Sequence, residues 1–174
     1  RENYLALPGS VDTAVYTLAG EITQDAQTDF DRASALCAYL RSAYPYTLLQ
    51  NMPPDNRDFV SWFLLDERQG YCTSFATAMA VMARMVGLPS RYVEGYAATP
   101  DADGVARVTQ QNAHAWVEIY FTGFGWLPFD PTPGIGNSED GDSSSDDPQS
   151  NPPTPSPSPS PTPTPNPTEE PNGS

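Results

Sequence analysis

Three side chains in this sequence, taken in chain order, have the chemical types that covalent catalysis through sulfur requires. Cys72 is followed 42 residues later by His114, the only histidine, and Asp130 follows after a further 16 residues. A thiolate attacks a carbonyl carbon, an imidazole takes and returns a proton, and a carboxylate orients the imidazole. These residues are therefore a candidate nucleophile, base and orienting acceptor, provided that the fold brings them together.

Each candidate also has an ordinary structural interpretation, which the sequence leaves open. A cysteine can simply begin a buried helix, a single histidine is often a surface or core residue, and an Asp before Pro131 commonly forms a turn. The second cysteine, Cys37, lies on the apolar side of a predicted helix and is interpreted as a small buried hydrophobe. A Cys37–Cys72 disulfide is disfavoured, because Cys37 then faces a contact between helix and core.

The element that would position the thiol is a helix over residues 71–86. Its residues are apolar almost all round, with Arg84 as the only charge, which predicts a helix buried within the domain. Gly87 supplies a C-terminal cap, and Pro89 prevents continuation. Cys72 would then lie at the helix start, where N–H groups and a partial positive charge stabilise a thiolate and can hold an oxyanion.

Three further helices are expected before this one. Apolar residues recur at helical spacing over 28–44, with Thr28 as N-cap and Pro45 as the terminator. A weaker helix is expected over 11–22, and a short one starts near Phe59 and ends before Gly70.

Short segments rich in β-branched and aromatic residues follow the helices. Four strands are predicted, over 91–97, 105–109, 113–121 and 125–129. Asp103-Gly104 marks a hairpin, and residues 123–125 mark another turn. Helices followed by an antiparallel sheet indicate an α+β domain with the helices on one face. His114 would lie on the third strand and Asp130 just after the fourth.

Composition narrows the function classes. The chain carries 22 acidic residues against 8 basic ones, all Arg, for a net charge of −14. Binding to nucleic-acid phosphates needs clustered basic residues, so no nucleic-acid partner is expected. No apolar run approaches the roughly 20 residues of a membrane span. Two cysteines are too few for a disulfide scaffold or a four-ligand zinc site, and we expect no cofactor and no metal.

The chain divides into two parts of very different composition. Residues 138–174 contain no aliphatic or aromatic residue but 11 of the 20 prolines and seven acids. Such a segment cannot bury enough apolar surface to offset the entropy of ordering, and alternating Pro-Ser and Pro-Thr favour an extended spacer. We therefore expect a folded domain over 1–137 and a disordered acidic, Pro-rich tail or linker over 138–174.

Four motifs in order along the chain resemble the transglutaminase-like core superfamily. They are Gly70-Tyr71-Cys72-x-x-Phe75-Ala76, Gly87-Leu88-Pro89-Ser90-Arg91-Tyr92-Val93-x-Gly95-Tyr96, His114-Ala115-Trp116-Val117-Glu118-x-Tyr120 and Gly125-Trp126-x-Pro128-Phe129-Asp130-Pro131-Thr132. The pattern is most similar to bacterial membrane proteins of the TgpA type, in which an extracytoplasmic transglutaminase-like domain sits between transmembrane segments.

The resemblance implies a papain-like α+β fold and a role for each candidate residue. Cys72 would be the nucleophile, His114 the general base and acid, and Asp130 the group that orients the imidazole. Arg91 and Tyr92 are assigned structural roles.

Four further residues are candidates for the oxyanion site or the substrate cleft. Trp116 and Trp126 would wall the cleft, although packing within the sheet explains them equally well. Tyr46 would supply a second oxyanion donor, and Thr73 would lie at the cleft edge.

The sequence departs from the family pattern at two places. The family often has an acid two residues before the histidine, where this chain has Asn112. If Asp130 were turned away, a Cys-His-Asn set would remain. Thr73-Ser74 replaces the Glu-His found in many bacterial relatives.

The resemblance implies acyl transfer on protein or peptide carboxamides through a Cys thioester, as in protein-glutamine gamma-glutamyltransferases. A cysteine peptidase or amidase with the same triad is the alternative within enzymes, and a non-catalytic binding module that keeps the fold is the alternative outside them. The expected partner is a protein or peptide substrate, for example one of the cell envelope.

The expected location follows from the same resemblance. The segment is expected to be a soluble, monomeric, extracytoplasmic part of a longer bacterial protein tethered to the membrane. It begins at Arg1 and ends within the Pro-rich stretch, which is consistent with a segment of a longer chain.

Overall fold

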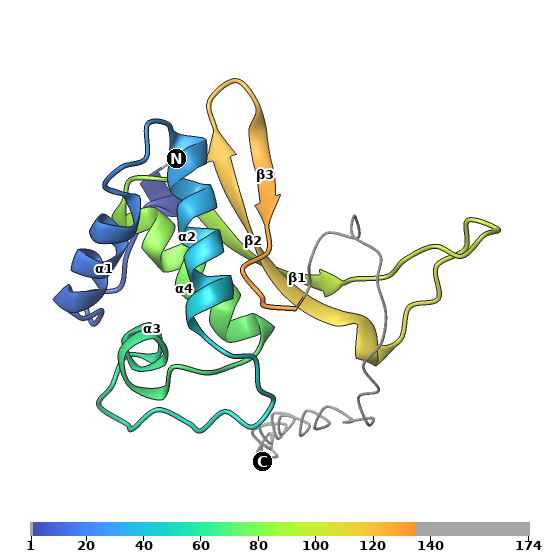
Figure 1. Cartoon of the computed structure of the whole chain (residues 1–174), viewed down its shortest axis with the longest axis horizontal. Coiled ribbons are helices and arrows are strands. Elements are labelled where there is room, and N and C mark those ends of the chain that lie inside the picture. The colour runs from blue at the N-terminus through green and yellow to red at the C-terminus, as the bar shows by residue number, and fades with distance from the viewer. Residues whose placement is uncertain (1, 135–174) are drawn as a thin grey trace, which may run out of the picture.

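The computed structural model describes residues 2–134 (Figure 1). Helices gather on one side of the domain and a small sheet lies on the other, so the predicted α+β fold is confirmed. The helices are α1 (Thr13–Thr23), α2 (Asp29–Ala43), α3 (Phe59–Trp62) and α4 (Cys72–Met85), and the strands are β1 (Ser90–Tyr96), β2 (Ala113–Phe121) and β3 (Gly125–Phe129). The predicted tail, 138–174, lies outside the described residues.

α2 begins after the predicted N-cap, Thr28, and ends just before Pro45, the predicted terminator. The Thr28 hydroxyl accepts a hydrogen bond from the Asp31 N–H, and the Asp31 carboxylate accepts one from the Thr28 N–H, which completes a capping box. The residue before Pro45 cannot easily remain helical, and the helix stops at Ala43 with Tyr44 extended. The predicted apolar face is buried except for Phe30, which is 53% exposed although its ring contacts Phe121 and Phe129.

α4 is the buried central helix that the sequence predicts. Every residue from 74 to 83 except Thr77 is buried, and the helix packs against β2, β1, α2 and α1. It ends in a turn that closes when the Leu88 N–H donates to the Ala83 carbonyl at 2.9 Å, with Gly87 at φ +83°. Only glycine adopts that backbone conformation without cost, so the predicted cap is confirmed.

The short helical segment after residue 58 consists of two unlike turns. α3 covers one turn, and a π-helical turn, η2 (Phe63–Glu67), continues it until Arg68 enters the left-handed region at φ +56°. The chain then runs beside Tyr46, which forms a parallel bridge with Gly70. This arrangement places residues 46 and 47 next to the start of α4.

The sheet is antiparallel in the order β1-β2-β3, so β2 is central (Figure 1). Alternate residues of a strand face opposite sides. On β2 the buried set faces the helices, and it consists of Ala115, Val117, Ile119 and Phe121. His114 and Trp116 belong to the other, half-buried set, and Gly95 is the cross-strand partner of His114.

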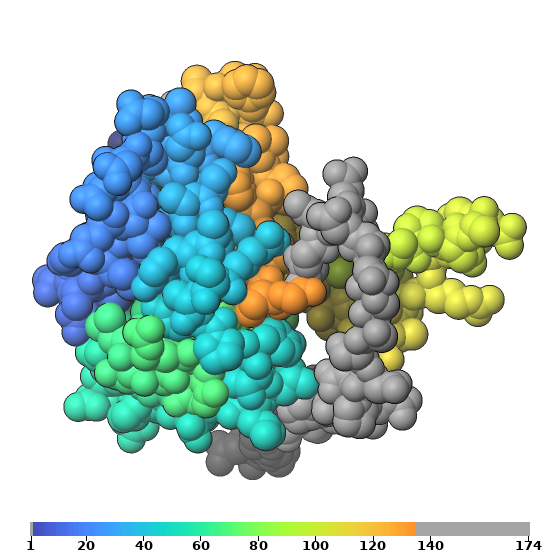
Figure 2. All heavy atoms as spheres, viewed as in Figure 1, coloured from blue at the N-terminus to red at the C-terminus, as the bar shows by residue number. Residues whose placement is uncertain are grey.

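The prediction of a strand over 105–109 is wrong. Residues 97–112 form a long connection that projects from the body of the domain, ending in the 3₁₀ turn η3 (Gln110–Asn112) (Figure 2). The turn at Asp103-Gly104 does form, because the Asp101 carboxylate accepts hydrogen bonds from the Asp103 and Val105 N–H groups. The residues after it remain exposed, since β1 pairs directly with β2 and leaves them no sheet or core to pack against.

None of the helices among residues 2–134 combines the length and the apolar character that crossing a bilayer demands.

The buried face of α2 generates a stability prediction. Leu40 is fully buried, so Leu40→Ala should lower the free energy of unfolding by about 2–5 kcal/mol through lost burial and a residual cavity. Leu49 is 87% exposed, so the matched Leu49→Ala variant should change it by no more than about 0.5 kcal/mol. Urea unfolding followed by circular dichroism measures both, and equal effects would contradict the assignment of the core.

Candidate active site

The clearest polar arrangement in the domain joins β2 to the end of β3. The His114 Nε2 atom lies 2.6 Å from Asp130 Oδ2, and the side chains are only 9% and 23% exposed. The other carboxylate oxygen, Asp130 Oδ1, accepts a hydrogen bond from the Thr132 N–H at 3.0 Å. Both carboxylate oxygens are therefore held, and the fold brings together the predicted base and its predicted orienting group.

This contact determines which ring nitrogen of His114 can act as a base. An ionised carboxylate only accepts hydrogen bonds, so the nitrogen that faces it carries the proton. That nitrogen is Nε2, which leaves Nδ1 of the neutral ring with a free lone pair. The tautomer is assigned from the hydrogen-bond partner, and it makes Nδ1 the atom that would accept a thiol proton.

Asn112 does not compete with Asp130 for this role. Its Oδ1 atom accepts hydrogen bonds from the Thr109 N–H and the Thr109 hydroxyl, at 2.8 and 3.0 Å, and closes the η3 turn. Asn112 thus belongs to the connection before β2, and the carboxylate that contacts His114 is that of Asp130.

Cys72 is the first residue of α4. Tyr71 is the N-cap in extended conformation, and its carbonyl accepts hydrogen bonds from the Ser74 and Phe75 N–H groups. The N–H groups of Cys72 and Thr73 precede these bonds, at the end of the helix where the dipole is positive. The predicted placement of the thiol at the mouth of the buried helix is confirmed.

Two tyrosines, Tyr46 and Tyr92, lie close enough to Cys72 for its charge to affect their pKa values. Tyr46 is held beside Gly70 by the bridge, and its pKa is raised by burial and then by the nearby Cys72 charge. The pKa of Tyr92 is raised to about 12, first by burial and then by a hydrogen bond of 2.5 Å to Glu94, with a smaller contribution from Cys72. Both phenols therefore stay protonated at neutral pH; the Tyr92 hydroxyl donates its hydrogen to Glu94, which leaves Tyr46 as the phenol that can donate to another group.

The sequence gives no sign that Tyr92 lies near Cys72, the candidate nucleophile. The Tyr92 hydroxyl interacts with the side chain of Thr73, the residue after Cys72, and the predicted structural role of Tyr92 stays a prediction. No motif spacing links position 92 to position 72. The contact arises because β1 returns along α4, and the alternation along β1 places Tyr92 and Glu94 on one face.

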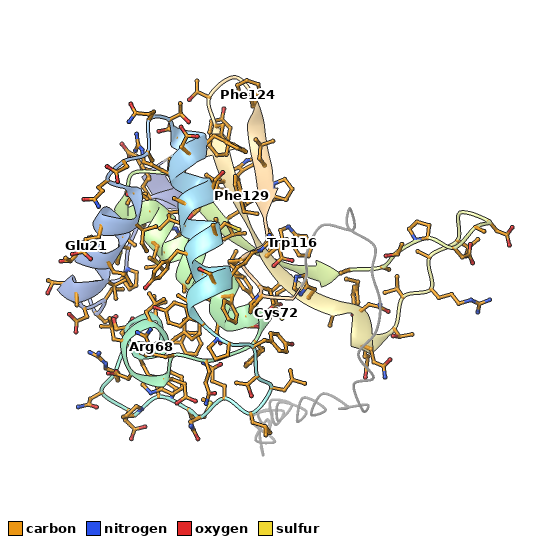
Figure 3. The ribbon with its side chains drawn as sticks, in the orientation of Figure 1. Glu21, Arg68, Cys72, Trp116, Phe124 and Phe129 are labelled. Carbon is orange, nitrogen blue, oxygen red and sulfur yellow. The ribbon has the colours of Figure 1, made fainter. Side chains whose placement is uncertain are left out.

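Figure 3 shows Cys72 in the region where α4 meets the sheet, near the labelled Trp116. α4 packs against β2, which carries His114. Among the described residues, no hydrogen bond joins the Cys72 sulfur to His114 or Asp130. Contacts between a nucleophile and its base are often long in a free enzyme and shorten when substrate binds, so the missing hydrogen bond does not argue against a triad.

The second cysteine, Cys37, contacts the backbone of Asp130. Cys37 is 9% exposed, as its predicted packing role requires, and its thiol donates a hydrogen bond to the backbone carbonyl of Asp130 at 3.2 Å. Burial raises the pKa of this thiol, partly opposed by Arg41 and reinforced by Asp130. The neutral S–H group therefore persists at neutral pH and helps to fix the chain at Asp130. Both cysteines are free.

A cavity of about 580 Å³ opens on the Asp130 side of the imidazole. α2 supplies one wall, and the ends of β2 and β3 supply the other; the lining residues are Phe30, Cys37, Arg41, His114, Trp116, Pro128, Phe129 and Asp130. Cys72 is not among them. The walls of the cavity are mainly apolar, and Arg41 is the one arginine among its lining residues.

The two candidate cleft tryptophans have different environments. Trp116 lines the cavity and stacks with His114, with ring centroids 6.4 Å apart and planes 23° apart. Trp126 does not line that cavity. It packs with Tyr4 and Tyr120 at 4.8 and 5.4 Å, beneath the Arg91 guanidinium at 4.4 Å.

No group of three or more His, Cys, Asp or Glu side chains within residues 2–134 is arranged to hold a metal ion.

The sequence of this domain matches a known protein family. The family model of the transglutaminase-like superfamily matches residues 16–131, which is more than half of the chain and includes Cys72, His114 and Asp130. The chain belongs to this superfamily. The resemblance inferred from the four motifs is thus confirmed.

Individual relatives of this transglutaminase-like domain are longer proteins. It is 38% identical over 159 residues to YebA of Bacillus subtilis, covering 83% of this chain and 22% of YebA. It is 37% identical over 131 residues to the protein-glutamine gamma-glutamyltransferase of Pseudomonas aeruginosa, covering 74% of this chain and 19% of that protein. The chain spans about a fifth of the length of these curated relatives.

The solved periplasmic domain of TgpA from Pseudomonas aeruginosa has a similar fold. The two structures superpose with a TM-score of 0.65 at 33% identity, covering 75% of this chain and 46% of the TgpA domain.

The unlike environments of the two cysteines of the transglutaminase-like domain generate a labelling prediction. In Cys37→Ala the remaining thiol, Cys72, should be alkylated by iodoacetamide at neutral pH. In Cys72→Ala the remaining thiol is Cys37, whose raised pKa and burial should keep alkylation slow until the pH is well above the roughly 8.5 of an ordinary thiol. Mass spectrometry over a pH series measures both rates. Rapid neutral labelling of the Cys72→Ala variant would contradict the assignment.

Proposed function

We propose that this domain is an acyltransferase that forms a thioester between Cys72 and a carboxamide of a protein or peptide. The observation that carries the proposal is the His114–Asp130 pair, whose tautomer leaves Nδ1 as a base on a strand packed against the helix that begins at Cys72. A purely structural Asp before proline would not need both carboxylate oxygens fixed and an imidazole held at 2.6 Å.

The first half of the reaction forms the thioester. His114 Nδ1 takes the thiol proton, and the Cys72 sulfur attacks the carboxamide carbon. The negative charge that develops on the carbonyl oxygen is held by N–H groups at the start of α4, with Tyr46 as a second donor. The imidazolium then returns the proton to the departing nitrogen as the C–N bond breaks. Asp130 stabilises the imidazolium throughout without changing its own protonation state.

The second half reverses these roles. An amine gives a proton to Nδ1, attacks the thioester carbon, and expels the Cys72 thiolate, which recovers its proton from His114. If water attacks instead, the products are those of an amidase or a peptidase. Transfer and hydrolysis therefore share one site and differ in the acceptor that reaches the thioester.

The relatives support the choice of transfer and an extracytoplasmic location. One curated relative carries the name protein-glutamine gamma-glutamyltransferase, and one solved relative is a periplasmic domain. We infer that this domain acts outside the cytoplasm, in a protein tethered to the membrane, on a protein or peptide of the envelope.

The choice between the alternatives is testable with a Gln-containing peptide, with and without a labelled primary amine. We expect a peptide–amine adduct in the presence of the amine, with Cys72→Ala giving none. The chain contains no lysine, so the domain itself offers no side-chain amine as a competing acceptor. Conversion of Gln to Glu without adduct would establish an amidase, a cleaved backbone a peptidase, and no product with an unreactive Cys72 a binding module.

A second prediction concerns the carboxylate. Asp130→Asn replaces one acceptor oxygen with an amide that can donate to Nε2, which favours the tautomer with the proton on Nδ1. We expect kcat to fall by roughly 10²–10⁴-fold with little change in KM or thermal stability. Asp101→Asn, a change of the same type in the projecting connection, is the matched control. An Asp130→Asn variant with more than half of the wild-type kcat would refute the orienting role.

A further inference from the structure

Gly95 is the one glycine of the sheet strands whose missing side chain leaves room for a neighbour's ring. A Cβ atom built on Gly95 would lie 2.6 Å from Cη2 of the Trp116 indole and 3.0 Å from its Cζ3. The first distance is far inside van der Waals contact. Its φ is not in the left-handed region, so the backbone does not demand glycine here. Glycine is required for steric reasons, because the Trp116 indole occupies the volume that a side chain at position 95 would fill.

The place of that ring matters because of the register between β1 and β2. Gly95 is paired directly with His114, and Val93 is paired with Trp116. The indole therefore leans diagonally across β1 into the position opposite His114, on the face of the sheet that the imidazole shares. There it stacks with the imidazole at a centroid distance of 6.4 Å.

The imidazole is thus constrained from two sides. The Asp130 carboxylate holds Nε2 within 2.6 Å, and the Trp116 ring lies beside the imidazole plane at an angle of 23°. A hydrogen bond fixes one edge of a ring but leaves it free to swing about that edge. A neighbouring flat surface limits that swing, and it thereby sets the direction in which the Nδ1 lone pair points.

We propose that Gly95 and Trp116 form a positioning pair for His114, in which Gly95 leaves the space that lets the Trp116 indole hold the imidazole against Asp130. Neither residue exchanges protons with substrate. The catalytic consequence rests on the proposed function, whereas the geometric claim about the imidazole does not.

The location of the pair separates this role from general stability. Trp116 is half-buried and lies outside the hydrophobic core cluster, on the face of β2 opposite to Val117 and Ile119. Gly95 lies one residue before the end of β1, where the projecting connection begins. A displaced indole at this edge is expected to leave the packing of α4 unchanged.

The test compares Gly95→Ala with Gly20→Ala. The second change adds the same methyl group to α1, where no atom lies within 4 Å of the new Cβ. In Gly95→Ala the indole has to move, and we expect the rate of Gln-peptide turnover to fall about 10–100-fold at nearly unchanged KM, because small displacements of catalytic groups carry costs of this order. Gly20→Ala should keep the wild-type rate.

A readout that does not need activity comes from the single histidine. Because His114 is the only histidine, its ring nitrogens give the only imidazole ¹⁵N signals of the protein. In the wild type and in Gly20→Ala we expect one tautomer with the proton on Nε2. In Gly95→Ala we expect these signals to shift toward a mixture of tautomers.

A rescue experiment tests the cause. Trp116→Phe removes the outer ring that contains Cη2, so adding Gly95→Ala to that background should lower the rate less than threefold further. Non-additivity of this kind is what two residues acting through one contact produce.

Three results would overturn the proposal. They are wild-type ¹⁵N signals in Gly95→Ala, a loss of turnover in Gly95→Ala that is fully explained by a lower melting temperature, and the same fold-loss in the wild-type and Trp116→Phe backgrounds. If the wild type turns over no Gln peptide, the proposed function fails, while the ¹⁵N comparison still decides whether Gly95 and Trp116 position the imidazole.

Discussion

The burial of α4 is the constraint on which the rest of the domain depends. A helix that is apolar almost all round has to be covered on every side, so α1 and α2 cover one side and the sheet covers another. Its first two residues, Cys72 and Thr73, are only half-buried, at the end of the helix where the N–H groups need acceptors. The start of α4 therefore reaches the edge of the core, and Cys72 is the residue that lies there. Access to the thiol follows from the packing.

Most of the local structure could be predicted from sequence, because its signals are local. The capping box at Thr28, the stop at Pro45 and the glycine after α4 are each read within a few residues, and the bounds of β2 and β3 follow from alternation between two turn signals. The strand expected at 105–109 does not form, because strand formation depends on contacts distant in the sequence. Its residue types suit a strand, but strand formation needs a neighbouring strand and a core face, and neither can be read from the segment itself.

Some contacts of the candidate site could likewise be predicted from the sequence, and others could not. The order of Cys72, His114 and Asp130 and the motifs around them predict the His114–Asp130 contact, because β2 and β3 are adjacent in sequence and in the sheet. The contacts made by Tyr92 and Cys37 could not be predicted. They join residues whose separation in the chain carries no pattern, and they depend on how β1 returns along α4 and how α2 crosses the end of β3.

The turn between β2 and β3 affects the contact between His114 and Asp130, although it lies at the opposite end of the hairpin. Gly123 and Gly125, both at φ +89°, set the hairpin so that Val117 pairs with Phe129. A slip of one residue would exchange the two faces of β2, turning His114 into the core and Ala115 toward the carboxylate. The register of this hairpin therefore decides whether the His114 imidazole reaches the Asp130 carboxylate at all. The turn at Gly123 and Gly125 thus sets the register that places His114 beside Asp130 at the opposite end of the hairpin.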